Sequence, residues 1–274
     1  MNLNLDADLA RRMAAPGDVE AALEAAKAEY RRLAALGSED KDWPVTGWFH
    51  CAEAARQLDL IKEKAAEIRR NAEVFVLVGV GGSNQAARAL IEAVKKPGGP
   101  AIVYAGNTLS AHGVAEVLKA IEGKSVYIDV IAKNFETLEP GSHYRVLRAA
   151  MAKRYSKEEM AKRVILTGTV GSRLEEIAKE NGCTFLHFPR RVGGRYSAFT
   201  PVALLPLAVA GLDVDAYLAG GLAMEEELAK TEGGLAAEYA AVRYALYRRG
   251  FQVEMLTAFE PRLYWAEQWW KQLF

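Results

Sequence analysis

The pattern of apolar and polar residues divides the chain into a helical beginning and a long stretch in which short apolar runs alternate with helical periodicity. Within residues 18–37, apolar positions recur at steps of three and four residues, and the same period returns at 58–68. These patterns predict two amphipathic helices, with Asp18 capping the first. The intervening residues 38–47 contain a proline between tryptophans, which predicts a loop.

From residue 74 onward, runs of β-branched and aromatic residues alternate with helical segments. The expected strands are residues 74–80, 101–104, 125–131, 164–167 and 184–188. Ser156 with Glu159, and Ser172 with Glu175, have the spacing of a helix capping box. Short apolar strands separated by helices predict an α/β fold, a doubly wound five-stranded parallel sheet in a three-layer αβα arrangement. In such folds, ligands bind at the carboxyl ends of the strands, where the strand order switches.

After residue 188 the regular alternation is interrupted. A basic, glycine-containing loop at 189–197 leads into residues 198–210, which are so apolar that we expect a buried helix. The remaining expected elements are helices at 213–230 and 235–249, a new strand at 251–257 and an aromatic-rich helix at 261–274. The sequence stops inside that last helix, with no polar tail or capping residue to end it, which indicates an interrupted architecture.

Composition and charge limit the possible classes of function. The chain has 274 residues, of which 51% are hydrophobic, and it carries 35 basic and 35 acidic side chains. It can bury a substantial core, and with no net charge it has no global field to recruit nucleic acid or an acidic membrane. Cys51 and Cys183 lack metal-site spacing, which is typical of free thiols in the cytoplasm. No stretch resembles a signal peptide or a membrane span, so neither secretion nor membrane insertion is indicated.

The most distinctive local signal is the glycine turn that ends the first expected strand. Gly81, Gly82 and Ser83 follow the apolar run, and helical periodicity resumes at Asn84. Such a turn lets the backbone approach a ligand, and the helix N-terminus favours an anion such as phosphate. The stretch matches neither a P-loop, which needs a following Lys, nor a dinucleotide fingerprint, which needs a third glycine where Asn84 stands. A phosphate site and a bare tight turn remain open, and a nicotinamide dehydrogenase is a further alternative.

Two later loops supply cations at the same expected edge of the sheet. Lys133 and Thr137 follow the third strand, where their ammonium and hydroxyl groups could meet the same anion. Arg195 is preceded by two glycines, and an arginine so placed suits a carboxylate, a phosphate or a developing oxyanion. Taken singly, the first loop also fits a solvated helix cap, and the arginine also fits a surface salt bridge.

Five segments of the sequence are more informative together than singly. They are GVGGSNQAARAL at 79–90, YAGNTLS at 104–110, VIAKNFETLEP at 130–140, VGGRYSAFTPVALLPLAVAGLD at 192–213 and EQWWKQLF at 267–274. In this order they resemble the phosphoglucose isomerase family of sugar-isomerase (SIS) folds. The resemblance implies a helical segment at 1–72, a first SIS domain at 73–212, and at 213–274 a helical connection with the truncated start of a second SIS domain.

The resemblance also implies an activity. The family interconverts glucose 6-phosphate and fructose 6-phosphate through an enediol(ate), in glycolysis and gluconeogenesis, without a metal or cofactor. Matched position by position, Arg195 would be the catalytic cation that stabilises the enediolate. The positions implied to bind the substrate or its phosphate are Gly82, Ser83, Lys133, Asn134, Thr137 and Gln272. The full-length form is expected to be a cytoplasmic homodimer.

Two departures from the family pattern change this expectation. Positions where family members commonly carry Ser or Thr hold Ala132, Asn134, Glu136 and Leu138. The loop therefore loses hydroxyl donors and gains a negative charge that repels phosphate. In addition, the glutamate that moves the proton between C1 and C2 would fall just beyond Phe274, with Glu260 and Glu267 as candidate substitutes. We therefore expect the chain alone to have little isomerase activity, and the alternative is a non-catalytic sugar-phosphate-binding SIS module.

Overall fold

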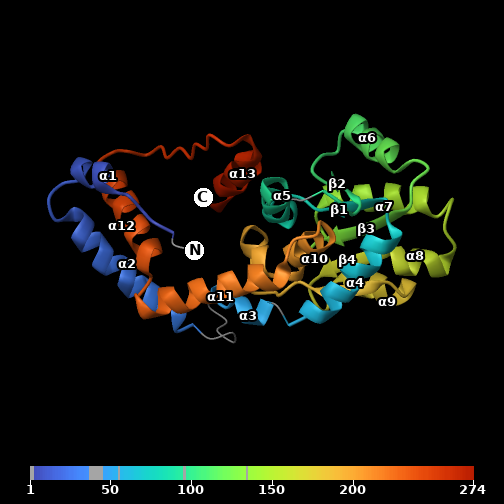
Figure 1. The fold of residues 1–274 in the computed structure, drawn as a ribbon, viewed down its shortest axis with the longest axis horizontal. Coiled ribbons are helices and arrows are strands. Elements are labelled where there is room, and N and C mark those ends of the chain that lie inside the picture. The colour runs from blue at the N-terminus through green and yellow to red at the C-terminus, as the bar shows by residue number, and fades with distance from the viewer. Residues whose placement is uncertain (1–2, 37–45, 55, 95–96, 134) are drawn as a thin grey trace.

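A five-stranded parallel sheet lies at the centre of the larger part of the molecule (Figure 1). The computed structural model describes residues 3–36, 46–54, 56–94, 97–133 and 135–274. The strands are β1 (Val74–Val78), β2 (Ala101–Ala105), β3 (Val126–Ile131), β4 (Val164–Gly168) and β5 (Thr184–His187). Their order is β2-β1-β3-β4-β5, with every pair parallel. The predicted doubly wound α/β fold is confirmed, and the strand order switches between β1 and β3.

Helices cover both faces of this sheet, and the side chains on both faces of β1 are therefore buried. Phe75 and Leu77 belong to one apolar core, whereas Val76 and Val78 belong to the other. The first layer consists of α4 (Leu58–Asn71), α5 (Gly82–Val94) and α10 (Pro201–Val209). The second consists of α6 (Ala111–Ile121), α7 (Leu138–Met151), α8 (Lys157–Arg163) and α9 (Arg173–Asn181). The very apolar segment expected at 198–210 thus contains the buried helix α10.

A second group of helices stands apart from the sheet and is here called the arm. Its elements are α1 (Asp8–Met13), α2 (Asp18–Ala34), α11 (Val214–Lys230) and α12 (Gly234–Arg248). In Figure 1, α11 leads away from the sheet, and α12 turns back to lie against α2. The small core between α2 and α12 includes Val19, Ala22 and Ala241. The short elements η1 (Gly47–Phe49) and α3 (Cys51–Ala54) lie between α2 and α4 in sequence.

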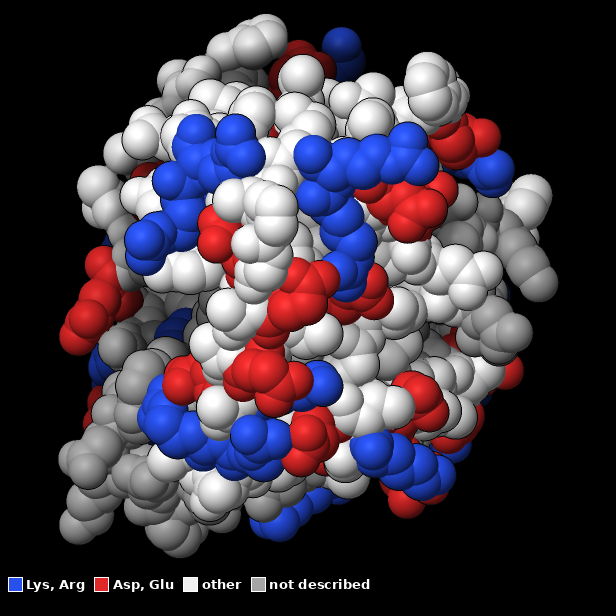
Figure 2. Space-filling model, turned by 90° about the vertical axis from the view of Figure 1, so that its left-hand side faces the viewer, with Lys and Arg blue, Asp and Glu red and all other residues white. Residues whose placement is uncertain are grey.

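The surface of the arm carries both signs of charge. Figure 2 shows lysines and arginines interspersed with acidic residues over this end of the molecule. Ion pairs such as Arg11 with Glu238, at 2.8 Å, join neighbouring helices there. This face offers no single-sign patch of the kind that nucleic acid requires. None of the helices in the described part of the chain combines the length and apolar character needed to span a bilayer.

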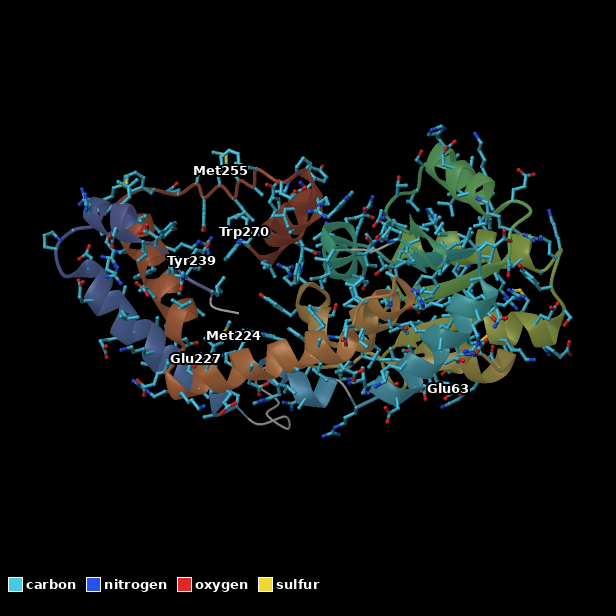
Figure 3. The ribbon with its side chains drawn as sticks, in the orientation of Figure 1. Glu63, Met224, Glu227, Tyr239, Met255 and Trp270 are labelled. Atoms are coloured by element: carbon cyan, nitrogen blue, oxygen red, sulfur yellow. The ribbon has the colours of Figure 1, made fainter. Side chains whose placement is uncertain are left out.

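The strand expected at 251–257 is absent from the structure. These residues are extended, but they make no ladder with any described strand. Their side chains are exposed, with Val253 at 88% and Met255 at 83%, and Met255 stands clear of the helices in Figure 3. An alternating apolar pattern becomes a strand only where a neighbouring strand supplies backbone partners. The segment instead connects the arm to η3 (Pro261–Leu263) and α13 (Tyr264–Leu273), the expected C-terminal helix.

Of the three helix N-caps predicted from the sequence, one forms in full. Ser156 and Glu159 form a complete capping box, as predicted. The Ser172 hydroxyl accepts from the Glu175 backbone N–H, but the Glu175 carboxylate accepts from Gly171 instead of closing the box. The predicted N-cap Asp18 lies inside the first turn of α2, and Gly17, with φ of +82°, occupies the cap. Most of the predicted loop at 38–47 lies outside the described residues, and the proposed division of the chain at residues 72 and 212 stays a prediction.

Candidate functional site

The turn between β1 and α5 is closed against a distant loop. Gly81 has φ of +56°, and Gly82 is the first residue of α5. A Cβ on Gly82 would lie 2.1 Å from the carbonyl carbon of Gly194 and 2.2 Å from the amide nitrogen of Arg195. Only glycine therefore fits at position 82, where two backbones approach each other. Tertiary packing thus requires this glycine even before any ligand is considered.

Asn84 holds the same turn from inside the protein. Its side-chain Nδ2 donates to the carbonyl oxygen of Gly79 at 3.3 Å, and the residue is buried. In the sequence, Asn84 stands out only because a dinucleotide fingerprint would have a glycine there. Its structural role was not predicted. The available signal is helical spacing, because Asn84 shares a face of α5 with the buried Ala87 and Ile91.

The loop that meets the turn is the 3-10 helix η2 (Gly194–Phe199). The hydroxyl of the buried Ser197 donates to the Gly194 carbonyl at 2.7 Å and lies 3.4 Å from the Gly82 carbonyl. The Arg195 carbonyl accepts the indole N–H of Trp269, on α13, at 2.9 Å. The Arg195 backbone is thus fixed on two sides, and the residue is exposed at the edge of the turn.

Lys133 is brought to the same edge by the register of the sheet. Val78 pairs with Val130, so the chain leaves β1 and β3 at the same level. The Lys133 Nζ donates to the Val192 carbonyl at 3.2 Å, two residues before η2 begins. Partial burial lowers the pKa of the Lys133 ammonium, and the nearby Arg190 charge lowers it further. A desolvated ammonium beside a second cation favours an anionic ligand.

Thr137 and Glu136, in the loop after β3, are less well placed than Lys133 to contribute to an anion site. Thr137 occupies the N-cap of α7 without a side-chain cap bond, and both Thr137 and Glu136 are exposed. No hydrogen bond within the described ranges links Thr137 to Lys133 or Ser83. Asn134 lies outside the described residues. The structure therefore brings Lys133 to the loop that leads into η2, and its role in binding, like that of Thr137 and Asn134, stays a prediction.

Gln272 reaches the turn from the C-terminal helix. α13 packs along α5, and the Gln272 Nε2 lies 2.6 Å from the point where a Cβ on Gly81 would sit. The Gln272 Oε1 is buried and has no hydrogen-bond partner in the described structure. A buried acceptor without a donor is costly, so a ligand hydroxyl at this point would satisfy it. The predicted contact of Gln272 with a substrate stays a prediction.

The site therefore combines backbone and side-chain donors, two cations and one unpaired acceptor around a strand end. Its members at the turn are Gly82, Ser83, Lys133, Arg195 and Gln272. No group of three or more His, Cys, Asp or Glu side chains suited to a metal occurs in the portion of the chain that the structure covers. Such an arrangement can hold an anion at one end and hydroxyl groups at the other.

Comparison with known proteins identifies the family of the chain. The family model "Phosphoglucose isomerase" matches residues 63–273. A glucose-6-phosphate isomerase from Symbiobacterium thermophilum is 38% identical over 244 residues, covering 84% of this chain and 54% of the relative. A glucose-6-phosphate isomerase from Clostridium perfringens is 39% identical over 227 residues, covering 78% and 50%. The chain thus spans about half the length of the curated relatives it matches.

Solved structures show the same fold. A hypothetical protein from Thermus thermophilus superposes with a TM-score of 0.79 at 26% identity, covering 94% of this chain and 61% of that one. A glucose-6-phosphate isomerase from Chlamydia trachomatis gives a TM-score of 0.75 at 20% identity, covering 93% and 55%, and supports the fold alone. With the family match and the identities of its relatives, the chain belongs to the phosphoglucose isomerase family.

Proposed function

We propose that this chain supplies the sugar-phosphate-binding half of an aldose–ketose isomerase that interconverts glucose 6-phosphate and fructose 6-phosphate through an enediol(ate). The observation that carries the proposal is the unpaired Gln272 Oε1 beside the glycine turn, since it offers an acceptor for a sugar hydroxyl next to donors for a phosphate. Relatives named glucose-6-phosphate isomerase support the reaction.

Each residue then has a separate role in binding or in charge stabilisation. The Gly82 backbone, the Ser83 hydroxyl and the Lys133 ammonium hold the phosphate, whose binding orients the sugar. The Arg195 guanidinium stabilises the negative oxygen that develops when C1 and C2 exchange a proton. Gln272 fixes a substrate hydroxyl. Asn134 and Thr137 are proposed to complete the phosphate loop.

The proton transfer needs a base, and the two candidate glutamates both take part in local hydrogen bonds. Glu267 accepts a hydrogen bond from the Ala258 backbone at 2.8 Å, and Glu260 accepts from the Arg262 backbone at 3.0 Å. Each carboxylate keeps further acceptor sites, but these bonds orient it toward its own local backbone. This observation favours the second candidate function, a sugar-phosphate-binding module without catalysis, for the chain acting alone.

A binding and turnover experiment tests both functions. Titration calorimetry of the purified chain should show binding of 6-phosphogluconate, and Ser83→Ala should weaken it about tenfold, as expected for a charge-assisted hydrogen bond. Turnover of fructose 6-phosphate should be at least about a hundredfold below that of a full-length relative, because both candidate glutamates are oriented by local backbone hydrogen bonds. Absence of 6-phosphogluconate binding would contradict both functions, and turnover at the rate of the relative would show that a base is available.

The proposal also covers the location and assembly of the protein. We place the protein in the cytoplasm, where sugar phosphates and free thiols such as Cys51 and Cys183 are stable. The full-length form is proposed to be a homodimer, which sedimentation of that form would test.

A further inference from the structure

The guanidinium of Arg88 lies between two aromatic rings from different elements. Arg88 belongs to α5, and its Cζ lies 4.3 Å from the ring centroid of Tyr104 on β2 and 3.3 Å from that of Trp265 on α13. A planar guanidinium stacks well on aromatic faces, and the contact strengthens when water is excluded. The stack therefore joins three elements, and one of them is the helix that carries Gln272.

Partial burial of the Arg88 guanidinium is energetically unfavourable. Arg88 is half-buried, and its Nε is buried without a hydrogen-bond partner among the described residues. Burial lowers the pKa of the Arg88 guanidinium, although Glu92 and the nearby tyrosines oppose that shift. The Tyr104 hydroxyl donates to Glu92 at 3.1 Å, so one of the two rings is itself held in place. The stacking contacts are thus the main interactions that the charged group makes.

α13 depends on such contacts for its position. It has ten residues, too few for a stable isolated helix. The segment 251–257 before it is exposed and is held to α12 through Glu254, which bonds to Tyr239 and Arg243. Trp265, Trp269 and Gln272 are spaced by four and three residues, so they lie on one face of α13. These three residues meet the Arg88 guanidinium, the Arg195 carbonyl and the Gly81 turn, in that order along the helix.

We propose that Arg88 is a positioning residue: its guanidinium, held between Tyr104 and Trp265, fixes α13 so that Gln272 stays over the β1–α5 turn. Arg88 does not touch the substrate in this proposal, and it acts through the helix that it holds. For the identity of the ligand, the proposal rests on the sugar-phosphate function given above. The position of α13 can be tested without any ligand.

The first experiment measures the position of α13 directly. The chain is labelled with 5-fluorotryptophan, and the ¹⁹F resonances are assigned by single substitutions. In Arg88→Met, which keeps the stem and removes the charged plane, the Trp265 and Trp269 resonances should shift or broaden while the Trp48 resonance stays unchanged. Trp265→Leu should move the Trp269 resonance in the same way. An unchanged Trp269 resonance in both variants would overturn the proposal.

Arg163 offers a matched control beside the beginning of β3, at the edge of the sheet away from the glycine turn. Its Cζ also lies between two rings, 5.0 Å from Tyr127 and 4.3 Å from Tyr155. Arg163→Met is expected to lower the thermal midpoint as much as Arg88→Met or more, because it also loses bonds to Ser125 and Val126. It should leave the Trp269 resonance unchanged. A shift of equal size in this control would mean that general destabilisation moves α13, and it would overturn the proposal.

The second experiment distinguishes binding of the sugar part of the ligand from binding of its phosphate. Because Gln272 is assigned to the sugar, Arg88→Met should weaken 6-phosphogluconate about fivefold and leave inorganic phosphate unchanged. In a Gln272→Ala background the fivefold effect should disappear, as expected for coupled residues. Equal weakening of both ligands, or an undiminished effect without Gln272, would overturn the proposal. If the unsubstituted chain bound neither ligand, the sugar-phosphate function would fail, and the ¹⁹F measurement would still decide the role of Arg88.

Discussion

Strand β1 and the extended segment at 251–257 are both expected to be strands from their sequences, and only β1 forms one. Every residue of β1 is buried, and the strand has a parallel neighbour on each side. The later segment has no ladder partner among the described strands, and its residues are almost all exposed. β1 is apolar throughout and the later segment only at alternate positions, but the main difference is that β1 has neighbouring strands and the segment has none. Apolar residues stabilise the fold where partners surround them, and the same residues contribute little where none do.

The largest expected effect on the free energy of unfolding comes from replacing one phenylalanine in β1, compared with one near the extended segment. Phe75, in β1, is 0% exposed, whereas Phe259, just after the extended segment, is 101% exposed. Phe75→Ala should lower the free energy of unfolding by about 3 to 5 kcal/mol, because it leaves a cavity in the core. Phe259→Ala should change it by less than about 0.5 kcal/mol. Urea denaturation of both variants checks the comparison, and similar losses would show that the extended segment is packed in solution.

The second prediction concerns two glycines. Gly82→Ala should lower the free energy of unfolding by about 2 kcal/mol or more, because a Cβ there would meet the Gly194 backbone at 2.1 Å. The matched control is Gly220→Ala in α11, where no atom lies within 4 Å of the added Cβ. There the expected change is a gain of about 0.5 to 1 kcal/mol, since alanine favours the helix. A stable Gly82→Ala variant would disprove the close approach of η2 to the turn.

The third prediction follows from a buried acid in the centre of the sheet. Burial raises the pKa of Asp129 from 3.8 to about 8, although the hydrogen bond from the Thr167 hydroxyl opposes the shift. The folded state therefore holds a proton that the unfolded state loses above pH 4. Stability contributed by the protonated acid is present at low pH and falls as pH rises from about 4 to about 8, by up to about 1.4 kcal/mol per pH unit.

Asp129→Asn removes this titration and provides the measurement. The stability of the variant relative to the unsubstituted chain should rise steadily between pH 4 and pH 8 and then level off. The exposed Asp215, paired with Lys62 at 3.0 Å, serves as the control, because Asp215→Asn should change stability little across this range. Parallel pH profiles for the unsubstituted chain and Asp129→Asn would contradict the raised pKa.

The smallest expected effect concerns local capping signals, which need no distant partner. Ser156→Ala should lower the free energy of unfolding by about 1 kcal/mol, since it breaks a complete capping box. Ser172→Ala should cost a few tenths of a kcal/mol less, because the Glu175 side chain already bonds to Gly171. Thermal unfolding of the two variants side by side measures the difference. A larger loss at Ser172 would reverse the assignment of the complete box.

The sequence was sufficient for features that depend on near neighbours. The five strands, the buried helix α10 and the Ser156 cap follow from apolar runs, periodicity and short spacing. The strand expected at 251–257 failed because its backbone needs partners that the local pattern does not encode. A tertiary partner, not a local signal, decides whether that alternation becomes a strand.

The candidate site shows the same limit. Motif order placed Gly82, Lys133 and Gln272 in one site, and the structure brings all three to one edge of the sheet. The reason for a glycine at position 82 is a backbone that arrives with Gly194, far along the sequence. The roles of Asn84 and Arg88 were equally hidden, since each depends on contacts that only the folded chain creates.

The close approach of Gly194 and Gln272 to the glycine turn also has a consequence for biosynthesis. Gly81 and Gly82 leave the ribosome long before the segments that complete their surroundings. At about 5 to 20 residues per second, synthesis of the intervening chain takes roughly 10 to 40 seconds. During that time the turn of the nascent polypeptide lacks these neighbours, and its surroundings are complete only after the ribosome has made α13.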